Sequence, residues 1–257
     1  MSSENNSSVK PKNRHGNFLY DFVKITGAIP AWLMIRPKIY RINKAKNPKG
    51  AFMVTANHPS PCDPITLLVS FPTRRLHCLA TIELFKTKLG SWFFERMHII
   101  PVDKENFNPL IFRDIQDRLA DGHPVVIFPE GRLTTQNDGA IQAFKSGAVL
   151  MAYKSGVSIL PVYLRKRDKW YQRQRIVIGE PINVTELIGK LPTKSAITST
   201  SEVVRERELE LQNYFESLPI GKKLLRKKAK LQAKAEKKAI KKSNKSASDK
   251  TSSPTSE

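Results

Sequence analysis

The sequence predicts an α/β domain with a mostly parallel central sheet flanked by helices. Short apolar runs typical of strands alternate along the chain with stretches of helical periodicity, the order that builds parallel sheets. The 257 residues are 40% hydrophobic, which suits one domain with a core and appended segments. Two of the predicted strands are followed directly by polar motifs. The carboxyl edge of the sheet is therefore where a ligand site is expected.

The chain is expected to have four parts. Residues 1–17 are rich in Ser and Asn and are predicted to be disordered. Residues 18–43 form an amphiphilic, membrane-associating segment, and residues 44–220 form the α/β domain. Residues 221–257 are a Lys-rich tail, either a solvated helix or a basic arm that orders on a charged surface.

The amphiphilic segment is too interrupted for a simple membrane span. Its stretch 18–35 is mostly apolar but contains Asp21, Lys24 and Pro30. Such a pattern favours a bent segment lying in a bilayer interface. A core helix packed on the domain is the alternative interpretation. The first seventeen residues are polar, so no secretory signal is expected at this end.

The strands and helices of the α/β domain follow in order along the chain. The expected strands occupy residues 51–56, 76–81, 98–102, 124–128, 158–164 and 175–178. Apolar residues three and four apart mark the expected helices, which occupy residues 65–69, 110–121, 140–154 and 201–218. This alternation is the basis for the parallel sheet.

The formal charge of +21 favours an anionic partner. Residues 221–257 contribute thirteen Lys and Arg against three acids, about half of that excess. Nucleic acid and an anionic membrane surface both fit, and charge alone does not separate them. The tail lacks interleaved aromatic residues, which disfavours nucleic acid. Cys62 and Cys78 form no disulfide framework and no metal-ligand spacing, which favours a reducing compartment.

The first polar motif sets a histidine and a carboxylate five positions apart. His58 and Asp63 flank two prolines, Pro59 and Pro61, that exclude a helix between them. Asp63 is predicted to cap the helix that follows. An imidazole held by a carboxylate can deprotonate a hydroxyl. A purely structural turn and cap is the other interpretation of this segment.

The second polar motif follows the strand at 124–128. Glu130 and Arg132 lie on a Pro- and Gly-containing loop at the expected carboxyl edge. The planar fork of Arg132 matches two phosphate oxygens, and Glu130 can accept a hydrogen bond from a substrate hydroxyl or orient the arginine. Each can also be an ordinary surface ion pair. Ser60 is disfavoured as a nucleophile because no Gly-x-Ser-x-Gly elbow surrounds it.

Together these motifs resemble the glycerolipid acyltransferase family, in particular its 1-acyl-sn-glycerol-3-phosphate acyltransferases. The resemblance is carried by Asn57-His58-x-x-x-x-Asp63 and Phe128-Pro129-Glu130-Gly131. Residues 100–104, 144–147 and 159–162 agree with other family motifs, in the right order over residues 36–182. Lys104 stands where the family usually has an arginine, and Arg132 follows Gly131 directly, without the usual intervening Thr.

The resemblance implies an acyltransferase of phospholipid biosynthesis. It would move a fatty acyl group from acyl-CoA or acyl carrier protein to the sn-2 hydroxyl of 1-acyl-sn-glycerol 3-phosphate, giving phosphatidic acid. It implies His58 and Asp63 as catalytic residues. The acceptor's phosphoglycerol part would be bound by Lys104, Glu130, Gly131 and Arg132.

The resemblance also sets expectations about partners and location. No metal and no bound cofactor are implied, because the acyl carrier is a co-substrate. The expected partners are an anionic membrane surface, a lysophospholipid acceptor and the acyl carrier. The expected location is the cytoplasmic face of a membrane, peripheral or monotopic. Another lysophospholipid or glycerol 3-phosphate is an alternative acceptor, and a non-enzymatic nucleic-acid-binding protein is the alternative class.

Overall fold

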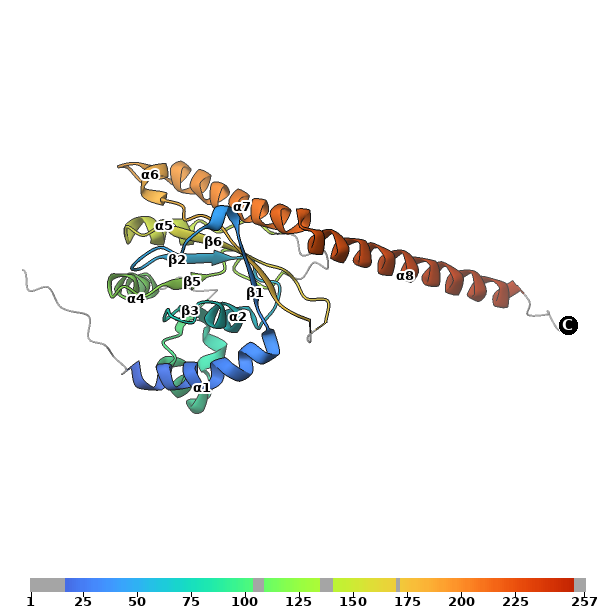
Figure 1. Cartoon of the computed structure of the whole chain (residues 1–257), viewed down its shortest axis with the longest axis horizontal. Coiled ribbons are helices and arrows are strands. Elements are labelled where there is room, and N and C mark those ends of the chain that lie inside the picture. The colour runs from blue at the N-terminus through green and yellow to red at the C-terminus, as the bar shows by residue number, and fades with distance from the viewer. Residues whose placement is uncertain (1–16, 104–108, 135–140, 170–171, 252–257) are drawn as a thin grey trace, which may run out of the picture. The chain divides into compact units, whose positions relative to one another are not determined.

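A computed structural model describes residues 17–103, 109–134, 141–169 and 172–251. In these residues the strands form one seven-stranded sheet with the order β1-β7-β6-β2-β5-β3-β4 (Figure 1). The five strands from β6 to β4 are parallel, and β7 pairs antiparallel with β6 and parallel with β1. The predicted α/β class with a mostly parallel sheet is confirmed.

The bounds of the elements agree with most of the predicted ones. The strands are β1 Lys38–Arg41, β2 Met53–Ala56, β3 His77–Thr81, β4 Ile100–Val102, β5 Val125–Ile127, β6 Ile159–Leu164 and β7 Arg175–Ile178. The α-helices are α1 Asn17–Ile35, α2 Asp63–Ser70, α3 Lys88–Arg96, α4 Pro109–Ala120, α5 Gly147–Lys154, α6 Val184–Ile188, α7 Lys194–Ser217 and α8 Pro219–Thr251. Two short 3-10 helices, η1 Ile42–Lys44 and η2 Ile82–Phe85, complete the described elements.

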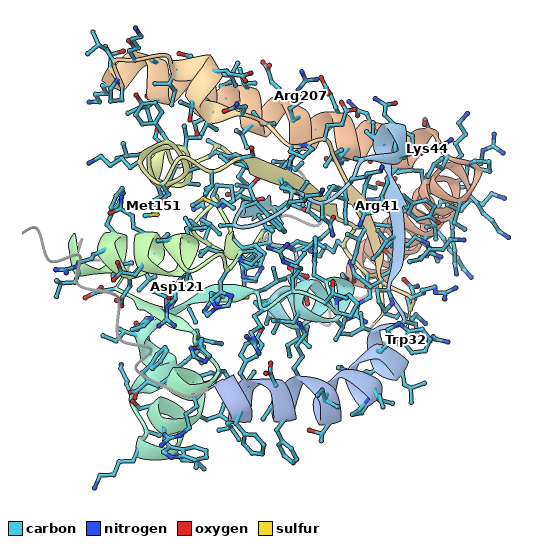
Figure 2. The ribbon with its side chains drawn as sticks, turned by 60° about the vertical axis from the view of Figure 1, so that its left-hand side comes forward. Trp32, Arg41, Lys44, Asp121, Met151 and Arg207 are labelled. Carbon is cyan, nitrogen blue, oxygen red and sulfur yellow. The ribbon has the colours of Figure 1, made fainter. Side chains whose placement is uncertain are left out.

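The core consists of two apolar layers, one on each face of the sheet. Val54 of β2 belongs to the layer that contains Leu67 of α2, whereas its neighbour Met53 belongs to the layer that contains Ile115 of α4 and Val204 of α7. This alternation follows from the pleat of a strand. All four residues of β2 are buried, as expected of a central strand covered on both faces. Figure 2 shows Arg207 on the exposed side of α7.

Helix α1 is tied to the loop between α2 and β3. The Tyr20 hydroxyl donates to the Leu76 carbonyl at 3.0 Å, and Asp21 accepts from Arg75. Tyr20 is buried, whereas most other apolar side chains of α1 are exposed. Within the described part of the chain, no single helix is long and apolar enough for a membrane span. Two segments of α1, Phe18–Gly27 and Ile29–Ile35, pass such a test only together and are bent by 44°.

Strand β1, helices α3 and α6 and the two 3-10 helices have no counterpart among the predicted elements. Strand β1 lies in the stretch interpreted as a membrane-associating segment, yet it pairs with β7 from Lys38↔Arg175 to Arg41↔Ile178. The two charged ends of this four-residue edge strand hide it in the sequence. Helix α3 was not predicted because its apolar residues are largely exposed and do not form a buried stripe.

The chain divides into two compact units, residues 1–212 and 213–257. The first contains the sheet and its covering helices. The second contains the end of α7 and the whole of α8. Helix α8 has a proline in its first position, where the missing N–H costs nothing. Its Leu225, Leu231 and Ile240 are exposed, so the Lys-rich tail is a solvated helix over its described residues.

Candidate active site

The first polar motif lies at the carboxyl end of β2, and a buried amide holds it there. The Asn57 side chain donates to the Leu164 carbonyl at 3.0 Å and accepts from the Leu164 N–H at 2.7 Å. These two bonds continue the pairing of β2 with β6 by one further position. His58, the next residue, therefore leaves the sheet from a fixed point.

His58 and Asp63 form a hydrogen-bonded pair, as the motif predicted. The His58 Nδ1 lies 3.0 Å from the Asp63 Oδ2, with 18% of the histidine side chain and 2% of the aspartate side chain exposed. The His58 ring also stacks on Phe128, with centroids 4.0 Å apart. A carboxylate at Nδ1 holds the proton on that nitrogen and leaves Nε2 with a lone pair. The imidazole is thus oriented as a general base.

Asp63 is the first residue of α2 and not its cap, which corrects the sequence-based prediction. The N-cap is Cys62, and no side chain provides a capping bond. The Asp63 Oδ2 instead accepts from the Ser60 N–H at 2.7 Å and from His58. Burial raises the pKa of the Asp63 carboxyl, while the bonds from His58 and Ser60 act in the opposite direction. The Asp63 carboxylate thus holds the turn through Ser60 and contacts the imidazole of His58.

The second motif lies beside the first because β5 pairs with β2. The Thr134 N–H donates to the His58 carbonyl at 2.8 Å and joins the two loops. Glu130 is buried and accepts from the Thr134 hydroxyl at 2.9 Å. Burial raises the pKa of Glu130, with the Thr134 bond as the main opposing contribution. Glu130 therefore lies within the site as a supporting carboxyl.

Gly131 and Arg132 form the outer part of this loop. Gly131 has a φ of 69°, a conformation that L side chains rarely adopt, and a Cβ there would lie 3.1 Å from the Lys145 Nζ. Arg132 is exposed, and its Nε donates to Gln142 at 2.9 Å. The loop thus presents two cationic side chains near its glycine. Lys104, the remaining predicted phosphate ligand, lies outside the described residues.

No group of three or more His, Cys, Asp or Glu among the described residues could hold a metal ion.

Glu208 on α7 is a further carboxyl of this region that the sequence reasoning missed. It is fully buried, and burial raises its pKa well above the usual range, with a contribution from the charge of Glu130. The Thr55 side chain and the Asn57 backbone oppose this shift. A signal for it exists in the sequence. Glu208 occupies the same helical stripe as the buried Val204 and Leu211, where an apolar residue is expected.

Comparison with known proteins agrees with the resemblance that the two motifs indicated. Residues 37–165, about half of the chain, match a family described as Acyltransferase. The sequence is 27% identical over 197 residues to the 1-acyl-sn-glycerol-3-phosphate acyltransferase of Bacillus subtilis (strain 168), a match that covers 74% of this chain and 96% of that protein.

A second relative and a solved structure extend the comparison. The chain is 32% identical over 151 residues to the probable 1-acyl-sn-glycerol-3-phosphate acyltransferase of Mycoplasma genitalium, covering 55% of this chain and 54% of that protein. The fold is similar to the crystal structure of PlsC, the 1-acyl-sn-glycerophosphate (LPA) acyltransferase from Thermotoga maritima, with a TM-score of 0.56. That match covers 79% of this chain and 82% of the other at 20% identity, so it concerns the fold.

Proposed function

Because the chain belongs to the Acyltransferase family, we propose that it acylates the sn-2 hydroxyl of 1-acyl-sn-glycerol 3-phosphate and forms phosphatidic acid. The observation that carries the proposal is the His58–Asp63 pair, with its 3.0 Å bond at the carboxyl edge of the sheet. The names of the relatives from Bacillus subtilis and Mycoplasma genitalium support the acceptor. The donor is an acyl thioester, on acyl-CoA or acyl carrier protein.

In this reaction the His58 Nε2 takes the proton of the acceptor hydroxyl as its oxygen attacks the thioester carbonyl carbon. Asp63 holds the imidazole and stabilises the imidazolium that forms. Collapse of the tetrahedral intermediate breaks the C–S bond, and the leaving thiolate receives the proton from His58. The products are phosphatidic acid and the free thiol. No covalent acyl-enzyme is formed.

The acceptor's phosphate is assigned to the cationic side chains of the second loop. The Arg132 guanidinium is exposed and donates to the neutral Gln142 side chain, so its charge can pair with a phosphate. Lys104 contributes a further charge in this proposal. Glu130 contributes by fixing the loop through Thr134.

Membrane association belongs to the same proposal, because the acceptor carries an acyl chain. Helix α1 exposes many apolar side chains, among them Phe18 at 82% and Phe22 at 52%. Apolar insertion by α1 and attraction of the basic tail to acidic lipids supply two independent binding contributions. The proposed location is the cytoplasmic face of a membrane, without a span.

Acyl-transfer assays on two variants test the assignment of the base. His58→Ala should lower kcat by about 10²- to 10⁴-fold, the range that a general base contributes. Ser60→Ala is the control, because Asp63 accepts from the Ser60 backbone N–H, which alanine keeps, and the Ser60 hydroxyl accepts from the Cys62 N–H at 3.3 Å. This control should retain activity. A folded His58→Ala protein with appreciable turnover would remove His58 as the base, and loss of activity in Ser60→Ala would indicate a serine nucleophile.

The acceptor is tested separately with a radiolabelled acyl donor and three acceptors. We expect the highest kcat/KM on lysophosphatidic acid, compared with lysophosphatidylethanolamine and glycerol 3-phosphate. A higher kcat/KM on either of the other acceptors would support acyl transfer but assign it to that acceptor. Nucleic-acid binding without acyl transfer to any acceptor would reject the proposal.

A further inference from the structure

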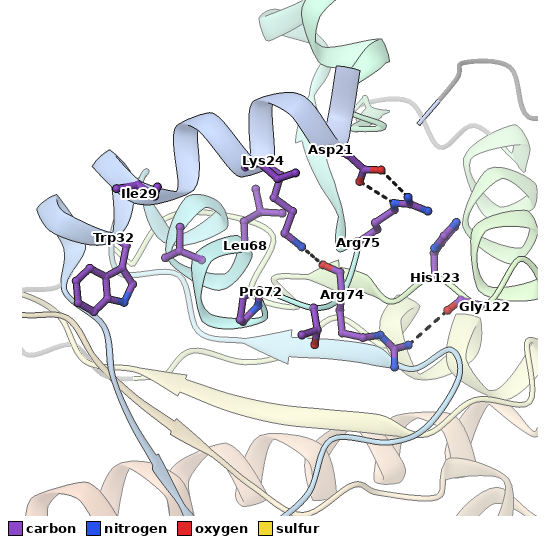
Figure 3. A pocket seen from close by; sticks show the side chains of 13 residues that line it. Asp21, Lys24, Ile29, Trp32, Leu68, Pro72, Arg74, Arg75, Gly122 and His123 are labelled. Atoms are coloured by element: carbon purple, nitrogen blue, oxygen red, sulfur yellow. Dashed lines mark hydrogen bonds and ion pairs between the residues drawn. The ribbon is translucent and has the colours of Figure 1, made fainter. Parts of the chain in front are cut away.

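A cavity of about 850 Å³ lies between α1 and α2, away from the His58 loop. Figure 3 shows its lining, with Lys24, Ile29 and Trp32 from α1 on one side and Leu68 from α2 on another. Its volume is in the range of small-molecule sites. Family membership and the catalytic motif leave this cavity unexplained.

The cationic end of the cavity lies at the edge of the sheet opposite to the active site. Arg74 and Arg75 precede β3, and Gly122 and His123 precede β5. His58 instead follows β2, which runs parallel to both β5 and its neighbour β3. The amino ends of these strands face one edge and the carboxyl ends face the other. An anionic group bound at the cationic end thus lies at the opposite edge of the sheet from a hydroxyl bound at His58.

The charges at this edge are unbalanced. Among the described residues that line the cavity, Lys24, Arg74 and Arg75 are basic, and Asp21 is acidic. Asp21 is occupied by Arg75, which donates to its two oxygens at 2.9 and 2.6 Å. One carboxylate therefore stands against three cations.

The other two cations, Lys24 and Arg74, donate to backbone carbonyls in the cavity wall. Lys24 donates to the carbonyls of Phe71, at 3.3 Å, and Arg74 (Figure 3). Arg74 donates to the carbonyl of Gly122 at 3.4 Å. Carbonyls satisfy donors without neutralising charge. Burial lowers the pKa of the Lys24 ammonium, the sign of a desolvated cation. An anionic group at this end would relieve that cost.

The other end of the cavity is apolar. Ile25, Ile29 and Trp32 lie four and three residues apart and form one stripe of α1. Their side chains are 69%, 67% and 49% exposed, so the stripe is open to solvent. The stripe extends from Ile25 to Trp32 across the bend of α1. The cavity thus combines a cationic end with an apolar groove.

We propose that this cavity binds one acidic phospholipid, with its phosphate at Lys24 and Arg74 and an acyl chain along the stripe of Ile25, Ile29 and Trp32. The charge complementarity selects an anionic headgroup, and the adjacent groove selects a lipid over a free anion. This second lipid site goes beyond the acyl transfer proposed for His58 and does not depend on it. A bound lipid would hold α1 against the bilayer that supplies the acceptor.

Calorimetric titration of the full-length protein tests the site. The probes are a short-chain phosphatidylglycerol below its micellar concentration, the matching phosphatidylcholine, and inorganic phosphate. No acyl donor is present, so the titration reports binding whatever reaction the enzyme catalyses. Lys24→Gln removes the charge and keeps an amide that can donate to the same carbonyls. Lys190→Gln removes one exposed charge outside the cavity and is the matched control.

The phosphatidylglycerol should bind with one site per chain, and Lys24→Gln should weaken it about fivefold, which corresponds to about 1 kcal/mol per cation near an anionic lipid. Lys190→Gln should leave the affinity unchanged. A phosphatidylglycerol brominated on its acyl chains should quench the tryptophan fluorescence, and Trp32→Phe should remove most of that quenching.

Three results would overturn the proposal. Equal weakening by Lys24→Gln and Lys190→Gln would indicate general surface charge. Equal affinity for phosphatidylcholine and phosphatidylglycerol would mean that the cavity binds the acyl chains and does not recognise the headgroup. Inorganic phosphate that competes fully with the lipid at similar affinity would indicate a site for a free anion.

Discussion

Asp63 combines a backbone contact with a contact to the catalytic imidazole. Its Oδ2 accepts from the Ser60 N–H at 2.7 Å and lies 3.0 Å from the His58 Nδ1. An asparagine would preserve the size of the side chain and one acceptor oxygen, but not the negative charge. In the proposed mechanism His58 becomes an imidazolium, and the negative charge of Asp63 stabilises that cation.

We therefore expect Asp63→Asn to lower kcat by about a hundredfold or more, with a smaller change in KM. Steady-state kinetics and a melting curve of the same preparation measure the two effects. An unchanged kcat in a folded variant would mean that Asp63 serves the turn alone.

Arg132 is assigned to substrate binding, so its removal should act mainly on KM. Arg132→Ala should raise the KM for the lysophospholipid about tenfold, since a charged hydrogen bond contributes roughly 1.5–3 kcal/mol. Arg207→Ala is the matched control, because Arg207 is an exposed arginine paired with Glu210. If both variants show the same KM, Arg132 has no part in phosphate binding.

Glu208 makes the stability of the domain dependent on pH. Its folded pKa is raised by burial, so the neutral acid is the form that suits the folded protein. This contribution is complete below the pKa of the unfolded chain and is lost as the pH rises through the folded pKa. Glu208→Gln keeps a neutral group of the same size at every pH.

Denaturant unfolding at pH 5 and pH 8 measures this effect. Relative to wild type, Glu208→Gln should gain free energy of unfolding at pH 8, on the order of 1 kcal/mol or more, since one pKa unit corresponds to about 1.4 kcal/mol. Glu206→Gln, on the exposed side of the same helix, should show no such pH-dependent gain. The same difference between wild type and Glu208→Gln at both pH values would contradict a titrating Glu208.

At the scale of elements, α1 has a buried contact and an exposed apolar surface. Tyr20 anchors the helix to the domain, whereas Phe18 and Phe22 stack on each other at 6.3 Å and are exposed. Neither phenylalanine lines the cavity beside α2. Both are thus suited to testing membrane insertion separately from the lipid site.

The double substitution Phe18→Ser and Phe22→Ser should weaken binding to phospholipid vesicles by at least about tenfold. Full burial of one such side chain contributes about 1.5–3 kcal/mol. Co-sedimentation measures the bound fraction. Leu191→Ser, which removes an apolar side chain that is 77% exposed outside α1, is the control and should leave binding intact. If the double variant sediments with vesicles as well as the wild type does, these phenylalanines of α1 do not contribute to membrane binding.

At the scale of the whole molecule, the basic tail can be removed without altering the sheet. Residues 221–257 carry thirteen basic residues against three acidic ones and contain most of α8. Their deletion should weaken binding to anionic vesicles, most strongly at low ionic strength. Activity on detergent-dispersed substrate should persist. Binding to vesicles of phosphatidylcholine is the control, and unchanged binding to anionic vesicles would leave the tail without a membrane role.

Much of the fold and of the catalytic pair could be predicted from the sequence because both depend on local patterns. Apolar runs marked six of the seven strands, and the spacing of His58 and Asp63 indicated their contact. Edge strand β1 escaped prediction because its charged ends look like a linker. The buried Glu208 interrupts the apolar stripe of its helix, but the contacts that make it part of the site come from β2, about 150 positions earlier in the chain. Tertiary contacts of that kind leave little trace in a single sequence.

The paired bonds of Asn57 to Leu164 have a consequence for how the enzyme meets its substrates. They hold the start of the histidine loop whether or not a lipid is bound, at 3.0 and 2.7 Å. Little of the substrates' binding energy is then spent on organising the base. Turnover should then be limited by the arrival and alignment of the two substrates, and so by the supply of the lysophospholipid acceptor.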